Sequence, residues 1–185
     1  MKRNYQGHLL VANPNNPLDI LSRSVILLVS HTGPNAVGLR INHPLVNLSL
    51  SKIADIMGLN YKGRDPIWQG GNINQNKIHV IHSLDWRGFS TVKITPNLGV
   101  TNDLSILMAI GSGIGPKYFK ACSGYLFWEH GRLDAQLDPK HDLEDEPHTW
   151  EIALATINNV FDDNYSSQWE RCIKDSVKYN IAEWF

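Results

Sequence analysis

The segment from Gly7 to Pro44 constrains the fold of this chain more than any other part of its sequence. Residues 24–30 (SVILLVS) place β-branched and other apolar side chains at successive positions, as in a strand that is buried on both faces. A turn signal at 32–35 (TGPN) separates them from a second run at 36–42 (AVGLRIN). Two such runs joined by a short loop are expected to pair antiparallel. Gly38, inside the second run, predicts a bulge or a close backbone approach.

Strand and helix patterns alternate along the rest of the chain. Strand patterns lie at 9–12, 67–69, 77–82, 89–95 and 118–127. Helical patterns lie at 48–57, 104–110, 129–137 and 164–179. Residues 150–157 fit either a strand or a short helix. We find no internal repeat, low-complexity tract or linker, so the sequence predicts a single domain over residues 1–185.

The composition is that of a globular protein, and it argues against two classes of partner. Of the 185 residues, 42% are hydrophobic and 19% are charged, and the formal net charge is −1. Nucleic-acid binding needs clustered Lys and Arg to neutralise phosphates, so this charge balance argues against direct binding to DNA or RNA. No apolar run approaches the ~18 residues that a membrane-spanning helix needs, so we expect no membrane association.

The cysteine and histidine content bears on location and on metal binding. Cys122 and Cys172 are the two cysteines, and the apolar stretch after the basic start is too short for a secretory signal. We therefore expect reduced, buried thiols in a cytoplasmic protein. The eight histidines are scattered without the spacing of a metal site. We expect neither a metal nor another cofactor.

Several segments, collinear over nearly the whole chain, resemble the YqgE/AlgH family of small bacterial proteins. The segments are GHLLVANP (7–14), AVGLRINHP (36–44), WQGG (68–71), HVIHS (79–83), SGYLFW (123–128) and GRLDAQL (131–137). The sequence departs from the family pattern at Asn13, where Met is usual, and at His43, where Arg is usual.

The resemblance implies an α+β fold. The expected single domain has a branched, mostly antiparallel sheet that is partly rolled into a small barrel and flanked by helices. Some members of the family are linked to transcriptional regulation, so the resemblance also implies a regulatory role. It assigns no catalytic residues.

Polar side chains gather around the ends of the first strands and form a candidate ligand-binding patch, here called the first-strand patch. Its members are Asn13, Arg23, His31, Arg40, Asn42 and His43. Arg23 precedes a strand that we expect to be buried, and Arg40 lies inside one. A buried guanidinium must bind carboxylates, carbonyls or a ligand anion, because an unpaired buried charge is costly. The patch is therefore either a site for a small anion or an internal ion pair with Asp19, Asp85 or Asp103.

Gly70 and Gly71, which follow Trp68, extend this candidate patch. Their backbone N–H groups would bind a phosphate group if they formed an anion-binding nest. A pair of glycines is explained equally well by a sharp exit from a strand, where φ is positive.

Three classes of function remain open. The one that we favour is a non-catalytic regulatory or interaction protein, a monomer or weak homo-oligomer, that binds a protein partner or a small anion at the first-strand patch. The second is a small hydrolase with His31 or His43 as general base, although the sequence has no G-x-S-x-G nucleophile elbow. The third is a DNA-binding transcriptional regulator, which the net charge and the lack of a helix-turn-helix pattern disfavour.

Overall fold

The computed structural model describes residues 3–15, 19–138 and 149–182. The strands are β1 (His8–Ala12), β2 (Val25–Thr32), β3 (Asn35–Arg40), β4 (Pro44–Ser49), β5 (Pro66–Gln69), β6 (Ile73–Ser83), β7 (Val92–Lys93), β8 (Leu98–Thr101), β9 (Phe119–Trp128) and β10 (Trp150–Leu154). The α-helices are α1 (Leu50–Ile56), α2 (Ser105–Gly111), α3 (Arg132–Leu137), α4 (Ile157–Val160) and α5 (Tyr165–Ala182), and a short 3-10 helix, η1, spans Asp19–Leu21.

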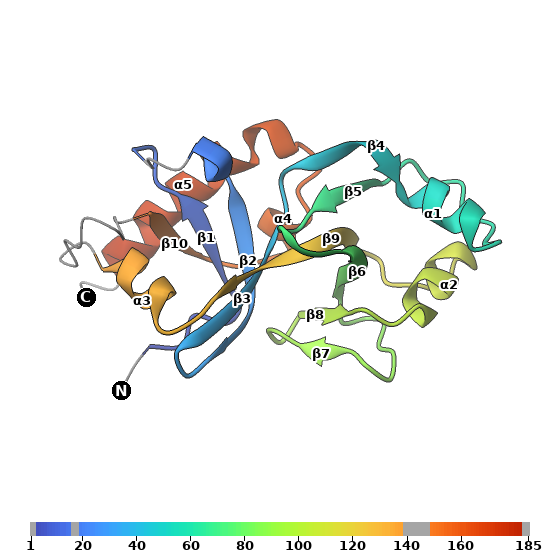
Figure 1. Cartoon of the computed structure of the whole chain (residues 1–185), viewed down its shortest axis with the longest axis horizontal. Coiled ribbons are helices and arrows are strands. Elements are labelled where there is room, and N and C mark those ends of the chain that lie inside the picture. Colours follow the sequence, from blue (N-terminus) through green and yellow to red (C-terminus); the bar gives the residue numbers. More distant parts are fainter. Residues whose placement is uncertain (1–2, 16–18, 139–148, 183–185) are drawn as a thin grey trace.

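One sheet, curled into a half-barrel, organises the domain (Figure 1). Its main path runs in the order β10-β1-β2-β3-β9-β6-β8-β7, with β4 and β5 off this path. The sheet branches at β9, which pairs antiparallel with β3 near its C-terminal end and parallel with β5 nearer its N-terminal end. On its other edge β9 pairs antiparallel with β6. The branched, mostly antiparallel sheet and the flanking helices confirm the predicted fold class.

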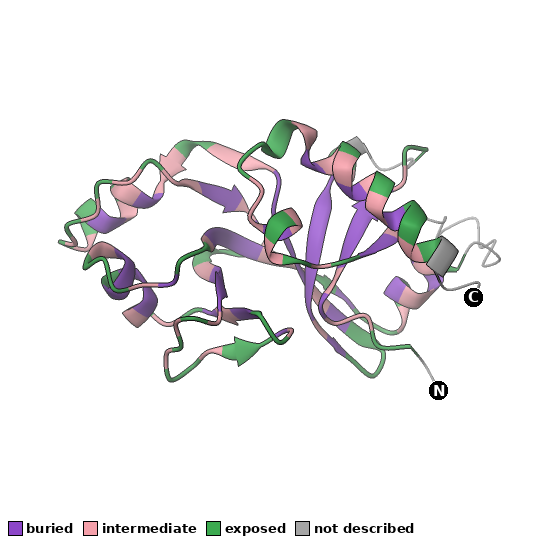
Figure 2. Cartoon of the chain, turned by 180° about the vertical axis from the view of Figure 1, so that it is seen from behind, coloured by how far each residue is buried: buried purple, intermediate pink, exposed green. Residues whose placement is uncertain are grey.

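The strands β1 and β2 are buried on both faces, as the apolar pattern at 24–30 predicts (Figure 2). One face of β2 contributes Val25 and Leu27 to a core cluster that extends across the curl of the sheet to Ile81. The opposite face, with Ile26 and Leu28, packs in a second cluster that contains Trp128, Leu133 and Trp150. The two-sided burial explains why this segment has no polar alternation.

Helices cover the two ends of the sheet. The long helix α5 lies along β10 and β1, and the indole of Trp169 donates a hydrogen bond to the Ala12 carbonyl at 2.8 Å. At the far end of the molecule, α1 and α2 pack against a third apolar cluster that includes Leu50, Ile67 and Ile106 (Figure 1). No helix in the described ranges is long and apolar enough to cross a membrane.

Gly38 makes the close approach that its position in the strand predicts. A Cβ added to it would lie 2.5 Å from Cγ2 of Ile26 and 3.0 Å from Cζ3 of Trp128. The pairing of β2 with β3 shifts by one residue between Leu28 and Ser30, opposite Gly38. The bulge therefore lies on β2, and glycine on β3 leaves room for the Trp128 ring.

Some elements differ from the sequence patterns. The helix expected over 48–57 begins only at Leu50, because Ser49 acts as its N-cap and residues 44–49 form β4 instead. The strand pattern at 89–95 yields only β7, two residues long. The ambiguous stretch at 150–157 is a strand, β10, followed by α4.

Candidate functional site

Lys120 lies on β9 with its charged group inside the protein, and only 6% of the residue is exposed. Its ammonium donates hydrogen bonds to the backbone carbonyls of Ile41, at 2.9 Å, and Asp162, at 3.5 Å. The same nitrogen lies 4.1 Å from the centroid of the Trp68 ring, within the range of a cation–π contact. Lysine is seldom buried this fully, so its position needs an explanation.

Burial lowers the pKa of Lys120 to about 8, because the charged form loses water. The nearby carboxylates of Asp162 and Asp163 oppose this shift without cancelling it. At pH 7 a group with this pKa is roughly 90% protonated. The side chain therefore still carries its positive charge into the interior.

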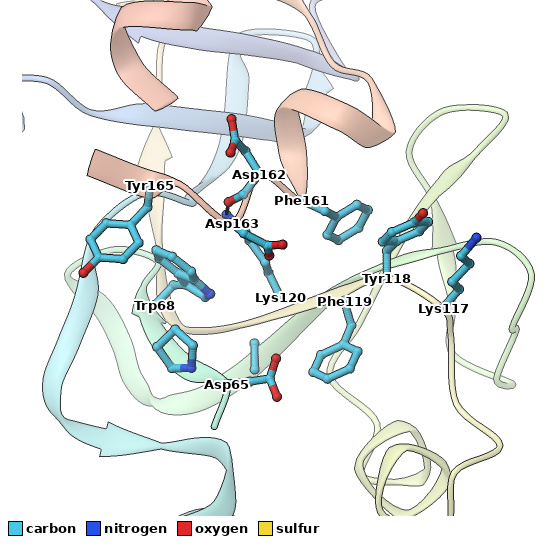
Figure 3. A pocket seen from close by; sticks show the side chains of 12 residues that line it. Asp65, Trp68, Lys117, Tyr118, Phe119, Lys120, Phe161, Asp162, Asp163 and Tyr165 are labelled. Atoms are coloured by element: carbon cyan, nitrogen blue, oxygen red, sulfur yellow. Dashed lines mark hydrogen bonds between the residues drawn. The ribbon is translucent and has the colours of Figure 1, made fainter. Parts of the chain in front are cut away.

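A cavity of about 240 Å³, here called the Lys120 pocket, opens over this lysine (Figure 3). Five aromatic rings form much of its wall, and they come from Trp68, Tyr118, Phe119, Phe161 and Tyr165. Tyr118 and Phe161 are stacked with centroids 5.7 Å apart, and Trp68 and Tyr165 meet edge to face at 5.5 Å. The pocket thus combines one buried cation and flat apolar surfaces with the charged side chains of Asp65, Lys117, Asp162 and Asp163.

Two of the three carboxylates that line this pocket have partners of their own. Arg171 on α5 binds the Asp162 carboxylate through Nε at 2.7 Å and also through Nη2. The Tyr61 hydroxyl donates to the carboxylate of Asp65, whereas Asp163 is exposed to solvent. The acceptors of the Lys120 ammonium are therefore neutral carbonyls rather than these carboxylates.

Asn42 and Arg40, two members of the first-strand patch, stabilise the ends of neighbouring strands. Asn42 accepts a hydrogen bond from the Val25 amide at 2.9 Å and donates to the Arg23 carbonyl at 2.8 Å. Arg40 is 6% exposed and donates to the backbone carbonyls of Gln69 and Ile20, each at 3.2 Å, and to the Gln69 side-chain oxygen. These partners are neutral oxygens.

The sequence analysis considered ion pairs between the arginines of this patch and Asp19, Asp85 or Asp103. Asp85 and Asp103 bind other groups instead. The carboxylate of Asp85 accepts from the Ser83 hydroxyl and the Lys117 amide, and that of Asp103 accepts from the Ser105 amide. The side chain of Asp19 lies outside the part of the chain that the structure describes. Carbonyl groups, rather than a carboxylate from Asp85 or Asp103, satisfy Arg40.

Arg23 is exposed, and the expectation that it is buried is wrong. Its side chain is 65% accessible, lies 3.7 Å from the Glu170 carboxylate and stands over the Trp169 ring at 5.1 Å. The residue has φ of 55°, which turns the chain just before β2 and directs the side chain outward. The side chain of Arg23 therefore lies against the exposed surface of α5 and not inside the sheet.

His31 lies at the opposite end of β2 from the rest of the first-strand patch. It pairs with Ala36, whereas Arg40 pairs with Ile26, five strand residues or about 16 Å away. Nδ1 of His31 accepts from the Tyr5 amide at 3.0 Å, and Nε2 lies 3.6 Å from the Asp134 carboxylate. His31 and His43 thus do not share one site, and a hydrolase with one or the other as its general base stays a prediction.

His43, Asn13, Gly70 and Gly71 lie with Arg40 at the other end of the strands. Nδ1 of His43 is 3.1 Å from the Asn42 side-chain oxygen, and burial together with the charge of Arg40 lowers the pKa of His43 to about 4. Asn13 donates to the Glu151 carboxylate at 2.9 Å. Ligand binding by any member of the patch stays a prediction.

The glycine pair follows β5, and neither glycine has the positive φ that the sequence analysis expected of a sharp strand exit. The pair does not form an open nest either. Both amides donate to the Ser123 carbonyl, at 2.9 Å from Gly70 and 3.3 Å from Gly71. A Cβ on Gly70 would lie 2.4 Å from the Gly124 carbonyl oxygen, and one on Gly71 would lie 2.1 Å from the Tyr125 carbonyl oxygen. Close packing against β9 explains both glycines, and their N–H groups already have a protein acceptor.

The thiols and the possible metal ligands offer no catalytic centre in the described residues. Burial raises the pKa of both Cys122 and Cys172 to about 12, which keeps them protonated and unreactive at neutral pH. No group of three or more His, Cys, Asp or Glu side chains that could hold a metal ion occurs in ranges 3–15, 19–138 and 149–182.

Sequence reasoning missed Lys120, although a signal for it exists. The strand FKACSGYLFW carries one charged side chain among apolar and small ones, and a lysine in such a run must either reach the surface or be buried with partners. Its partner Ile41 belongs to the segment between Arg40 and Asn42. The Lys120 pocket therefore borders the first-strand patch from the inside.

Comparisons with known proteins establish the family. A model of the AlgH-like family matches residues 9–178. The chain belongs to the AlgH-like family. A UPF0301 protein of Methylococcus capsulatus is 32% identical over 91% of this chain and 89% of its own length. The UPF0301 protein YqgE of Escherichia fergusonii is 28% identical over 92% of this chain and 91% of its own.

Two solved structures share the AlgH-like fold. The solution structure of the AlgH protein from Pseudomonas aeruginosa superposes with a TM-score of 0.74 at 24% identity, covering 95% of this chain and 92% of that one. A crystal structure of a protein from Corynebacterium diphtheriae gives a TM-score of 0.70 at 19% identity, covering 92% and 87%. These structures show the shared fold, and the family model and the sequence relatives confirm the family resemblance seen in the sequence.

Proposed function

We propose that this AlgH-like protein is a non-catalytic binding protein for a small planar anion, such as an aromatic carboxylate, in the Lys120 pocket. The observation that carries the proposal is the protonated ammonium of Lys120, buried at an aromatic-walled cavity with neutral carbonyls as its acceptors. Burying this charge is costly, and an anionic ligand would offset that cost.

The donor geometry leaves room for such a ligand. An ammonium has three N–H donors, and the carbonyls of Ile41 and Asp162 accept two of them. The third donor is available to a carboxylate or a similar acceptor. A charge-assisted hydrogen bond of this kind is roughly twice as strong as a neutral one.

The walls of the pocket favour a planar body. The rings of Trp68, Tyr118 and Phe161 present flat apolar surfaces to the cavity, and aromatic groups pack well in stacked or edge-to-face arrangements. The volume of about 240 Å³ is near the lower limit for ligand pockets, roughly 300 Å³. A ligand with one ring and one anionic group matches both the size and the chemistry.

A binding role rather than a catalytic one is supported by the state of the reactive groups. Lys120 is largely protonated at neutral pH, so its amine is a poor nucleophile. The two thiols are protonated as well. The protein would then act by binding a ligand and not by catalysis. A non-catalytic role is also the class of function that the sequence analysis favours.

Calorimetric titration with benzoate and with its neutral analogue benzamide tests this proposal. We expect the protein to prefer benzoate, and Lys120→Met, which keeps an apolar stem without the charge, to reduce that preference by at least about tenfold. Lys117→Met is the matched control, because Lys117 lines the same cavity but is exposed, and it should change the preference less than about threefold. An unchanged preference in Lys120→Met would refute the proposal.

A further inference from the structure

Two histidine rings hold the backbone of Tyr5, which precedes β1. Nδ1 of His31, near the end of β2, accepts a hydrogen bond from the Tyr5 amide at 3.0 Å. Nδ1 of His8, the first residue of β1, lies 3.2 Å from the Tyr5 carbonyl oxygen. The Tyr5 ring is stacked on the His31 ring and meets the His8 ring edge to face, each with centroids 5.8 Å apart. Tyr5, His8 and His31, here called the Tyr5 clamp, join the N-terminal segment to the first two strands.

The directions of these hydrogen bonds determine where each ring carries its proton. A backbone amide only donates, so Nδ1 of His31 has no hydrogen and the neutral ring has its proton on Nε2. A backbone carbonyl only accepts, so Nδ1 of His8 has the proton. Nε2 of His8 can then accept from the Tyr179 hydroxyl, which lies 3.3 Å away. The clamp thus contains two neutral imidazoles in opposite tautomers.

A second proton would have different consequences on the two rings. On His8 it would bind Nε2, and the Tyr179 hydroxyl could rotate and accept instead of donating. On His31 it would bind Nδ1, toward which the Tyr5 amide hydrogen already points. A backbone amide cannot become an acceptor, so two N–H groups would then face each other. Protonation of His31 therefore breaks its hydrogen bond to Tyr5.

The charged and titratable groups that border the clamp are Arg3 in the N-terminal segment, Asp134 on α3 and Tyr179 on α5. The Asp134 carboxylate lies 3.6 Å from Nε2 of His31, whose side chain is only 5% exposed. This carboxylate favours a charged His31 ring, whereas the guanidinium of Arg3, 5.7 Å from the centre of the Tyr5 ring, opposes it. Burial lowers the pKa of His8, which favours its neutral form.

We propose that His31 is a pH-sensitive latch for the N-terminal segment, in which protonation of Nδ1 releases the Tyr5 amide and loosens residues 3–5 from β2. In the neutral state His31 holds Tyr5, and in the protonated state Asp134 holds the imidazolium while Tyr5 has lost its acceptor. Such an exchange of partners is how a histidine switches a contact with pH.

The other contacts of the segment limit how far the release extends. Arg3 donates to the Tyr179 hydroxyl at 3.1 Å, but this hydrogen bond is exposed. The Gln6 side-chain amide reaches the carbonyls of Lys93 and Ile94 only at 3.4 Å. The Gly7 amide donates to the Leu28 carbonyl at 2.9 Å, and a carbonyl does not titrate. The segment should therefore loosen up to Gly7. None of the clamp residues lines the Lys120 pocket, so the latch is independent of the proposed anion binding.

NMR of the full chain between pH 7.5 and pH 5 tests this proposal. The ring ¹⁵N shifts of His31 report its tautomer and its protonation, and amide hydrogen exchange gives protection factors corrected for the intrinsic effect of pH. We expect the neutral ring to carry its proton on Nε2. The protection factor of the Tyr5 amide should fall at least about tenfold as His31 gains its proton. The Gly7 amide is the internal control and should change less than about twofold.

Two variants separate the latch from a general effect of acid. His31→Asn offers a side-chain oxygen near the position of Nδ1 and cannot be protonated, so Tyr5 should stay protected over the whole range. Asp134→Asn removes the carboxylate that favours the imidazolium, so the loss of Tyr5 protection should move to lower pH. A loss in His31→Asn equal to that of the wild type would overturn the proposal.

Three results in the wild type would also overturn it. The first is a His31 ring that stays neutral down to pH 5, and the second is constant protection of Tyr5 while His31 is protonated. The third is an equal loss at Tyr5 and Gly7, because the edge of the sheet as a whole, and not the contact with His31, would then respond to acid.

Discussion

The ammonium nitrogen of Lys120 lies 4.1 Å from the centre of the Trp68 ring, and the parallel pairing of β5 with β9 holds the two together. The register aligns Trp68 with Cys122, two residues from Lys120 on the same strand. A desolvated cation–π contact is worth about 2 kcal/mol. The contact thus offsets part of the free-energy cost of burying the lysine. A bound anion would offset more of that cost.

The stability of the protein should depend on the charge of Lys120. Its pKa is about 8 in the folded state against 10.5 for the free side chain, so the unfolded chain binds more protons between these values. Stability from this residue therefore rises with pH from 8 to 10.5, by on the order of 3 kcal/mol at 1.36 kcal/mol per pKa unit. Urea unfolding of the wild type and of Lys120→Met at pH 7.5 and pH 10 gives the change in unfolding free energy with pH for each protein. The difference between the two changes is the contribution of Lys120, because the other titrating groups are common to both proteins. Parallel changes in both proteins would show that Lys120 does not carry this linkage.

His43 should make the protein sensitive to mild acid. Its pKa is about 4 in the folded state against 6.5 for the free side chain, so protons bind preferentially to the unfolded chain between these values. Stability from His43 is present above pH 6.5 and is lost as the pH falls toward 4. Because His43 is only half-buried, we expect a loss of about 1–2 kcal/mol. Denaturant unfolding at pH 6.5 and pH 4 should show a loss of unfolding free energy that is smaller in His43→Gln than in the wild type by about 1–2 kcal/mol. The same pH dependence in both proteins would contradict the prediction.

Arg40 and Arg23 should differ sharply in their effect on stability. Arg40→Met removes three partly buried hydrogen bonds to carbonyl and amide oxygens, and we expect it to lower the free energy of unfolding by about 3 kcal/mol. Arg23→Ala removes an exposed side chain that contacts Trp169 and Glu170, and the expected loss is below about 1 kcal/mol. Chemical denaturation of both variants provides the comparison. A larger effect for Arg23→Ala would restore the structural role that the sequence assigned to it.

Gly71→Ala should disrupt the junction of β5 with β9. The new Cβ would lie 2.0 Å from the Tyr125 carbonyl carbon, a backbone atom that can move only with its strand. We expect a loss of about 3 kcal/mol or more, or a failure to fold. Gly111→Ala is the matched control, since its Cβ would meet only the Leu59 Cβ, at 3.7 Å, at the end of α2. That change should stabilise the protein by about 0.5–1 kcal/mol, and thermal unfolding of both variants distinguishes the cases.

Local patterns in the sequence predict the elements whose environment is set by their own residues. The apolar run at 24–30 predicts β2 because both of its faces are buried, and the helical spacing at 104–110 predicts α2 within one residue. The patterns fail where pairing with distant chain decides the structure. Residues 44–49 form β4 through contacts with β5, although 48–49 continue a helical pattern.

The candidate site was predictable only in part for the same reason. Arg40, Asn42 and His43 are neighbours in sequence, and the structure keeps them at one end of the strands. His31 lies at the opposite end because β2 and β3 run antiparallel, so strand direction separates residues that composition alone would group. Lys120 comes next to Ile41 and Trp68 only through the branching of the sheet at β9, which no local pattern in these segments reveals.

The register of the outermost strands sets the order in which the chain can complete its sheet. β1 pairs with β10, with His8 opposite Leu154. One edge of β1 therefore stays unpaired until the ribosome has synthesised β10, roughly 150 residues further along the chain. At about 5–20 residues per second, a ribosome takes on the order of 10–30 s to cover that distance. The first three strands, of which β1 and β2 are buried on both faces in the folded protein, therefore emerge with an unpaired edge while the remainder of the chain is still being synthesised. Closure of the sheet at β10 is a late, non-local step, and the nascent chain is exposed to strand-edge association until it occurs.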